Sequence, residues 1–165
     1  DQTRIREREA EAGLSVLGIE DKLFLRYPDQ ELTSSPEVVR TVGHVIKEAT
    51  PDILFVPYFL DTHPDHAIAS RIVGEALRTH PRDTMCYVTA LAPNIIVDVT
   101  DVMDAKIQAL REHASQVRNC DYPEKVRGLN AFRSMHASPG ITHCEAFIRQ
   151  SRKEFLRMMG LSDQS

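Results

Sequence analysis

The chain has 165 residues, of which 42% are hydrophobic and 27% charged, and its formal net charge is −4. This composition is ordinary for a globular domain with a sizeable core, and the acidic balance argues against nucleic acid as a partner. No apolar run reaches the roughly 18 residues of a transmembrane segment. The three cysteines, Cys86, Cys120 and Cys144, lie far apart, so we expect no disulfide framework and a reducing, cytoplasmic setting.

The N-terminal third is predicted to contain two helices around a short strand. Apolar residues at helical spacing, ended by Gly18, predict a helix over residues 4–17. The sequence KLFLRY predicts a short strand over 22–27. Ser34 or Ser35 is expected to cap a second helix, which would run from 36 to 49.

A buried strand and the loop after it occupy the middle of the chain. The continuous apolar run PDILFVP predicts a parallel strand over 53–56 that is covered on both faces. The loop DTHPDH follows at 61–66, and a helix is expected from about 67 to 79 with Asp65 as its N-cap. Ligands of parallel sheets bind beyond the carboxyl ends of the strands, and this loop occupies such a position.

Strands and helices continue to alternate in the rest of the chain. The predicted elements are strands over 85–91, 95–99 and 141–148, and helices over 101–115, 123–137 and 152–159. This alternation predicts one α/β domain over residues 1–165, a sandwich with a mainly parallel sheet. The helix over 123–137 is rich in polar residues, and its pattern leaves open whether it faces solvent or a partner, including a second copy of the chain in a homo-oligomer.

The loop DTHPDH carries the side chains best suited to bind a metal. Histidine and carboxylate oxygens are zinc ligands, and a catalytic zinc site has three protein ligands and one open position. His63 and His66, three residues apart, could face one cavity. On spacing alone, a solvated loop before a capped helix explains the segment equally well, but its position after a strand and the nearby Asp61 favour a function.

Other chemistries receive less support from the sequence. Adjacent residues of a strand point to opposite faces, so His143 and Cys144 would not meet as the pair of a cysteine hydrolase. The sequence contains no glycine-rich phosphate loop, which disfavours a nucleotide hydrolase.

Several segments together resemble the PIG-L/LmbE-like zinc-dependent de-N-acetylases. In chain order these segments are Arg6-x-x-Glu9-Ala10 with Leu17-Gly18, LFLRYPDQEL with Asp29, PDILFVP followed by HPDH, and PNIIVDVT, KIQAL, HASQ and CEAF. They cover most of the chain, and HPDH after PDILFVP is the most specific of them.

The resemblance implies a Rossmann-like, three-layer α/β fold and hydrolysis of the N-acetyl group of an N-acetylglucosamine-type sugar or conjugate. A water activated by Zn²⁺ would attack the amide. By the matching motif, His66 would bind the zinc, and His63 would stabilise the oxyanion or protonate the leaving amine. Asp65 would orient His63 and favour its charged form, whereas Arg6 and Asp29 would hold sugar hydroxyls or a phosphate.

One hallmark of that family does not occur in this sequence. The family's HPDDE-type segment follows its first strand and supplies a histidine and an aspartate to zinc, as well as the aspartate that acts as general base. We therefore expect an N-terminal strand and helix to be absent from this chain, which would be the C-terminal portion of such a domain. An inactive fragment or degenerate relative that serves as a binding or assembly module is the alternative.

Overall fold

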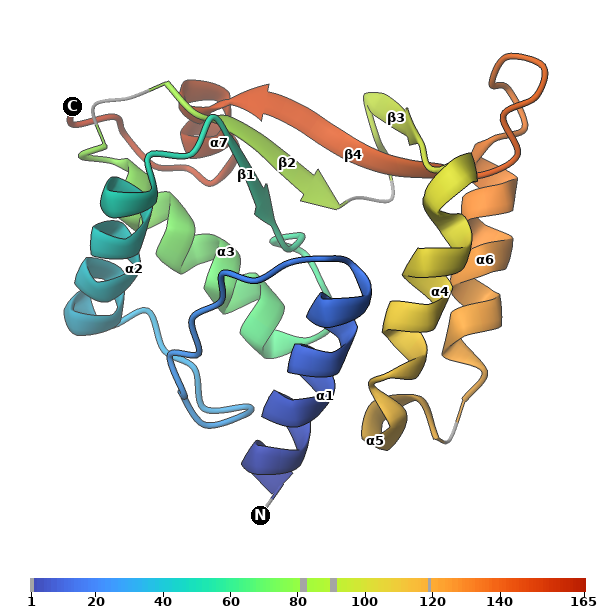
Figure 1. Cartoon of the computed structure of the whole chain (residues 1–165). Helices are drawn as coiled ribbons and strands as arrows, with labels where there is room; N and C mark the ends of the chain where they lie inside the picture. The colour runs from blue at the N-terminus through green and yellow to red at the C-terminus, as the bar shows by residue number, and fades with distance from the viewer. Residues whose placement is uncertain (1, 81–82, 90–91, 119) are drawn as a thin grey trace. The chain divides into compact units, whose positions relative to one another are not determined.

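The computed structural model describes residues 2–80, 83–89, 92–118 and 120–165. Helices and strands follow one another along this length (Figure 1). In chain order the elements are α1 (Gln2–Val16), α2 (Pro36–Ala49), β1 (Ile53–Val56), α3 (Pro64–Leu77), β2 (Met85–Thr89), β3 (Ile95–Asp98), the 3-10 helix η1 (Thr100–Val102), α4 (Met103–Arg111), α5 (Ala114–Val117), α6 (Tyr122–Arg133), β4 (Cys144–Ser151) and α7 (Arg152–Met158).

Most predicted elements are confirmed, but some details are wrong. The strand over 53–56 forms but is not covered on both faces, because Ile53 and Phe55 are 49% and 64% exposed. The strand expected over 22–27 does not form, because residues 19–28 adopt neither helix nor strand. Leu23 in this stretch is 64% exposed, so its apolar side chain is not buried as in a sheet. The helix expected over 101–115 is divided into η1, α4 and α5. The last two residues of the strand expected over 85–91 lie outside the described residues.

The strands hydrogen-bond in the order β1-β2-β4-β3. Strands β1 and β2 are parallel, with Val56 beside Val88, whereas β4 runs antiparallel to β2, with Ile148 beside Val88. The parallel pair follows from the α3 crossover between β1 and β2, as in other βαβ units. The antiparallel strand β4 makes the sheet mixed, whereas the sequence predicted a mainly parallel sheet.

The chain divides into two compact units. Unit 1 contains the residues before 26 together with 96–145, and unit 2 contains residues 26–95 and 146–165. The core of unit 1 is built around Met103 and Ile107 of α4. Gly13 allows α1 to approach α4 closely, because a Cβ atom at this position would lie 3.1 Å from the carbonyl oxygen of Ala109. The single domain expected over 1–165 stays a prediction.

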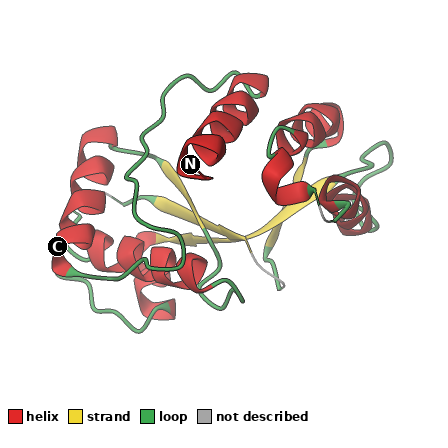
Figure 2. Ribbon diagram, turned by 90° about the horizontal axis from the view of Figure 1, so that it is seen from below, coloured by secondary structure: helices red, strands yellow, loops and turns green. Residues whose placement is uncertain are grey.

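The core of unit 2 lies between one face of the sheet and the helices α2, α3 and α7 (Figures 1 and 2). Strand side chains such as Val56 and Val88 pack there against Leu77 of α3 and Phe155 of α7, both fully buried. Ser35 caps α2 by accepting the N–H of Val38, as one of the two predicted caps. These contacts fix β1 and α3, the elements on either side of the DTHPDH loop.

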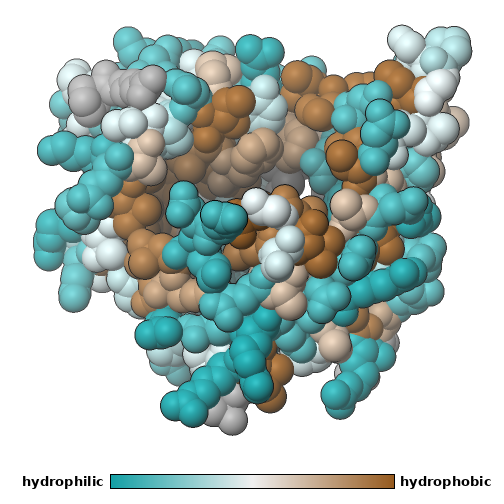
Figure 3. Space-filling model, in the orientation of Figure 1, coloured by the Kyte–Doolittle hydropathy of each residue, from teal (hydrophilic) through white to brown (hydrophobic). Residues whose placement is uncertain are grey.

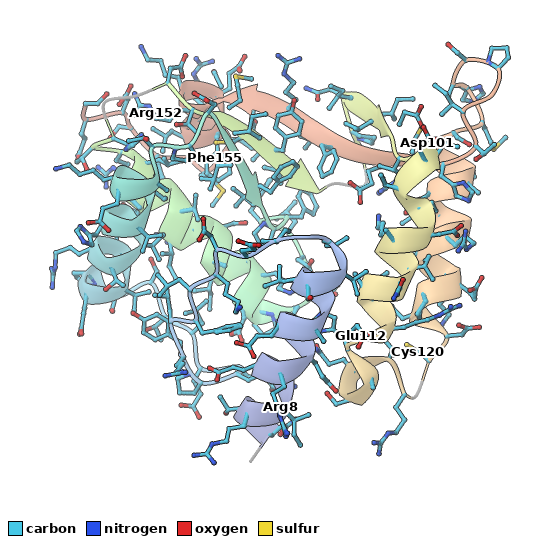
Figure 4. All side chains as sticks on the ribbon, viewed as in Figure 1. Arg8, Asp101, Glu112, Cys120, Arg152 and Phe155 are labelled. Atoms are coloured by element: carbon cyan, nitrogen blue, oxygen red, sulfur yellow. The ribbon has the colours of Figure 1, made fainter. Side chains whose placement is uncertain are left out.

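A buried arginine anchors the C-terminal segment to unit 2. Arg152, which is labelled in Figure 4 at the start of α7, is 3% exposed. Its guanidinium donates to the Leu77 carbonyl oxygen at 2.9 Å and to both carboxylate oxygens of Asp163 at 2.8 Å. This two-fold contact, with further hydrogen bonds from Ser165, holds the pKa of the Asp163 carboxyl far below its ordinary value.

We predict that Asp163 stabilises the fold above the ordinary aspartate pKa of 3.8 and ceases to do so as the pH falls toward its lower folded-state pKa. Asp163→Asn should therefore lower the melting temperature at pH 7, and the difference from the parent chain should shrink as the pH falls below about 4. Thermal unfolding between pH 7 and pH 2 measures this. Asp101→Asn, at an exposed carboxylate of unit 1, is the control and should follow the parent chain. A constant deficit of Asp163→Asn at every pH would contradict the prediction.

Candidate metal and catalytic site

The loop between β1 and α3 is organised by the carboxylate of Asp61. One oxygen, Oδ1, accepts the backbone N–H of His63 at 2.8 Å, and the other, Oδ2, lies 3.0 Å from Nδ1 of His66. The N–H of His63 is the main cause of a lowered pKa of Asp61, and the ring of His66 adds to it. Asp61 therefore carries a negative charge that orients the His66 ring and directs Nε2, the opposite ring nitrogen, away from this contact.

His63 forms the N-cap of α3. Its Nδ1 accepts the backbone N–H of Asp65 at 3.3 Å, and Pro64 occupies the first helical position. The prediction that Asp65 is the cap is therefore wrong: the helix begins at Pro64, and Asp65 lies within the first turn, where a carboxylate complements the helix dipole. The rings of His63 and His66 stack with centroids 4.7 Å apart, so both imidazoles lie side by side at the start of α3.

A turn far away in the sequence is joined to the same helix start. The N–H of Glu31 donates to the carbonyl oxygen of Pro28 at 3.3 Å and closes a turn that contains Asp29 and Gln30. Gln30 has a left-handed φ of 64°, and its N–H donates to Oδ2 of Asp65 at 2.7 Å. This hydrogen bond spans 35 residues and fixes the turn beside α3.

The turn brings Asp29 next to two of the loop side chains. One potential ligand atom from each of Asp29, His63 and Asp65 lies within 4.8 Å of the others. None of the three residues is buried. The second carboxylate oxygen of Asp65, Oδ1, is buried and has no hydrogen-bond partner among the described residues. A buried carboxylate oxygen without a partner is costly, and a cation would satisfy it. Two carboxylates and an imidazole are also a donor set that zinc accepts, so these residues fit a metal.

The structure brings together four of the five site residues predicted from the sequence. Asp29, His63, Asp65 and His66 all belong to unit 2 and lie at or beside the start of α3. Arg6, expected to contact substrate, belongs to α1 in unit 1. His66, expected to bind zinc, is not one of the three clustered ligands, and its role stays a prediction.

Sequence reasoning missed two contributions to the site. The sequence analysis assigns no contact to Asp61, yet its carboxylate contacts both histidine residues. The backbone N–H of Gln30 was not considered at all, although it connects the turn to Asp65. The spacing of Asp61 from His63 is an Asx-turn signal that could have predicted the first contact, whereas no local pattern predicts a contact over 35 residues.

We predict that the Gln30 N–H is needed to hold Asp29 in place. Gln30→Pro removes this donor and cannot adopt a positive φ, so it should reduce the unfolding free energy by about 1–3 kcal/mol and weaken metal binding about 10-fold or more. Gln30→Gly is the matched control, because it retains the N–H and tolerates the backbone angle, with a stability change under about 1 kcal/mol. Thermal unfolding and zinc titration test both variants. Equal zinc affinity in the two variants would contradict this role.

Comparison with known proteins identifies relatives of the chain. Residues 1–77 match the model of the PIG-L family, described as GlcNAc-PI de-N-acetylase. The chain is 31% identical, over 68% of its length and 56% of the relative, to a probable N-acetyl-alpha-D-glucosaminyl L-malate deacetylase 2 of Bacillus anthracis. It is 28% identical to the diacetylchitobiose deacetylase of Thermococcus kodakarensis, over 73% of its own length and 51% of that protein. The chain thus spans about half the length of these relatives.

A solved structure extends the likeness to the fold. The N,N'-diacetylchitobiose deacetylase of Pyrococcus horikoshii, solved in complex with its inhibitor MPG, has a TM-score of 0.78 and 25% identity. The likeness covers 89% of this chain and 63% of that one. The expected Rossmann-like α/β fold is therefore confirmed. These matches show that the chain resembles the PIG-L family in sequence, through residues 1–77, and in fold.

Proposed function

We propose that this chain provides part of the active site of a zinc-dependent hydrolase that removes the N-acetyl group from an N-acetylglucosamine-type sugar or conjugate. The observation that carries the proposal is the cluster of Asp29, His63 and Asp65 beside His66, in which a buried carboxylate oxygen of Asp65 has no partner among the described residues. The names of the relatives, which are deacetylases of N-acetylated sugars, support the substrate class.

The residues that would hold the metal surround the first turn of α3. His66 would bind through Nε2, since Asp61 engages its Nδ1 in the arrangement typical of metal-binding histidines. The carboxylate of Asp65 would supply a further ligand or stabilise the metal charge from nearby. When bound, zinc supplies Lewis acidity that lowers the pKa of a water toward neutrality and polarises an acetamide carbonyl.

His63 is suited to handle the proton that the leaving amine requires. Its Nδ1 accepts the N–H of Asp65, so the ring carries its proton on Nε2 when neutral. From Nε2 it can donate a hydrogen bond to the oxygen that gains negative charge during attack, and as the imidazolium it can release a proton to the amine. The carboxylates of Asp29 and Asp65 lie near the ring, and we propose that Asp65 helps to orient it.

Asp29 and Arg6 are proposed to contact the substrate, and the free cysteines support a location in the cytoplasm. Asp29, exposed in its turn, can accept hydrogen bonds from sugar hydroxyls. Arg6 of α1 is proposed to bind a hydroxyl or a phosphate. All three cysteines are free thiols, as is usual in a reducing cytoplasm. None of the helices in the described part of the chain has the length and apolarity needed to cross a membrane.

The alternative is an inactive binding or assembly module. It is supported by the lack of an HPDDE-type segment in this sequence. The relatives do not favour it, since those reported above are named as deacetylases. Zinc content distinguishes the hydrolase from the inactive module even if the chain is a piece of a longer protein. The cluster of Asp29, His63 and Asp65 can bind zinc without catalysing a reaction. A chain that retains no zinc above background would favour the module.

We predict different effects for the two loop histidines. His66→Ala should lower zinc affinity, by about 10-fold or more for the loss of a ligand. His63→Ala should lower zinc affinity less than His66→Ala does, because His63 is assigned the proton rather than the metal, and it should lower kcat by about 10²–10⁴-fold, the usual contribution of a general acid. Zinc content by elemental analysis and acetate release from an N-acetylglucosaminyl compound measure the two effects.

The matched control is His44→Ala, which removes an exposed histidine of unit 2 whose Nε2 lies 3.3 Å from Glu48. This variant should retain both zinc and acetate release. If His63→Ala and His66→Ala had the same zinc content and the same kcat, the assignment of roles would be wrong.

A further inference from the structure

A groove lies between α2 and α3 in unit 2. The hollow at one end of it has a volume of about 420 Å³, within the range of small-molecule sites. It is lined by Ser34, Pro36, Val39, Arg40, Arg71 and Glu75. The three clustered ligands and His66 are not among these residues, so the hollow is a different site from the one at the first turn of α3.

The groove continues into a second, larger hollow. This hollow has a volume of about 1010 Å³ and shares Val39, Arg40 and Glu75 with the first. Where the two helices meet in it, the contact is between small residues, because a Cβ atom on Gly43 of α2 would lie 3.6 Å from the Cβ atom of Ala76 of α3. The space above these small residues is therefore open.

Arginine side chains give the first hollow a positive charge. Arg40 of α2 and Arg71 of α3 are both exposed, and neither forms an ion pair with any residue that the structure describes. The acidic residue of the hollow, Glu75, is already bound by Arg78 at 2.8 Å. Lys47 adds a further positive charge in the second hollow. Figure 3 shows hydrophilic side chains along the left edge of the view, where α2 lies in Figure 1.

We propose that the groove binds an organic phosphate monoester, with the phosphate in the first hollow between Arg40 and Arg71. A guanidinium group donates two parallel N–H bonds to one oxyanion, and a phosphate monoester offers three oxygens and about two negative charges to two such groups. A carboxylate has fewer oxygens and a single charge, so it matches only one arginine. The hydroxyl of Ser34, which lines the same hollow, can donate a further hydrogen bond.

The rest of the groove indicates what the phosphate is attached to. A phosphate alone does not fill the two hollows, and the apolar side chains of Val39 and Ala76 are available to the organic part. The carboxylate of Glu75 lines both hollows and can accept hydrogen bonds from hydroxyl groups. The organic part is therefore expected to be small and hydroxylated. This inference does not depend on the proposed function, since the groove and the metal cluster share no residue.

Nuclear magnetic resonance can locate the ligand on the chain. The amide spectrum of the chain, freed of metal by chelation and dialysis, is titrated with glycerol phosphate at about pH 8, where the monoester carries nearly its full charge. The chemical-shift changes should saturate and should be largest at residues 34–40 and 71–75. Malonate, a dicarboxylate of similar charge, should bind several-fold more weakly at equal ionic strength.

Substitution of either arginine tests the assignment. Arg40→Ala and Arg71→Ala should each weaken the binding of glycerol phosphate about 10-fold or more, because each removes a charged contact with two N–H donors. Arg40→Lys retains the charge but not the paired donors, so its affinity should lie between those of the parent chain and Arg40→Ala. Arg157→Ala is the matched control and should bind as the parent chain does, because Arg157 is an exposed arginine of the same unit that lines neither hollow.

A titration that does not saturate, or equal affinity in Arg157→Ala and the two alanine variants, would overturn the inference. Malonate binding as tightly as glycerol phosphate would also overturn it. So would shifts centred on His63 and His66, because they would place the phosphate at the proposed metal site. The dispersion of the same spectra shows that each variant is folded. Arg71→Ala should keep the zinc affinity of the parent chain, so a failure of this inference is distinguishable from a failure of the proposed function.

Discussion

The candidate site depends on one carboxylate, that of Asp65. Its Oδ2 accepts the N–H of Gln30 and ties a distant turn to the first turn of α3, while its backbone N–H caps the helix through His63. Its Oδ1 is left buried without a partner among the described residues. One side chain thus assembles the site and presents a negative charge within it. Since burial of an unsatisfied carboxylate oxygen is unfavourable, this arrangement is better explained by a cation than by stability of the fold.

The surrounding fold supports this arrangement from both sides of the loop. The strand β1 ends at Val56, whose side chain is buried in the core of unit 2, and α3 is fixed at its other end by the fully buried Leu77. The carbonyl oxygen of Leu77 accepts from Arg152, so the C-terminal segment also restrains α3. Rigid elements on either side of a short loop are what a site needs to hold its ligands within fractions of an ångström.

The features that could be predicted from the sequence are those that depend on residues close together in the chain, such as helix caps and short apolar strands. The apolar run over 53–56 forms a strand that buries Val56 in the core of unit 2, and Ser35 with Pro36 begins α2 as capping rules require. The same rules failed for residues 22–27, where a short apolar run adopts neither helix nor strand, and for the cap of α3, where a histidine replaces the more common aspartate. His63 and His66 were recognisable because they follow a strand directly.

The remaining parts of the site could not be predicted in this way, because they depend on contacts between distant segments. Nothing near Gln30 indicates that its N–H meets Asp65, and nothing near Asp29 indicates that its carboxylate lies beside His63. Asp29 was singled out only by resemblance to a family, as a substrate contact. Its proximity to the other two ligands gives it a second possible role, in holding a metal.

The most direct test of the account is zinc binding by the parent chain and by Asp65→Asn. Asparagine retains an oxygen that can accept the Gln30 N–H but loses the negative charge and the second oxygen, so the turn is kept while the proposed cation contact is removed. Calorimetric titration should show a zinc site in the parent chain and an affinity lower by about 10–100-fold in the variant. Equal affinity in both, with the fold intact, would contradict the claim that Asp65 organises a metal site.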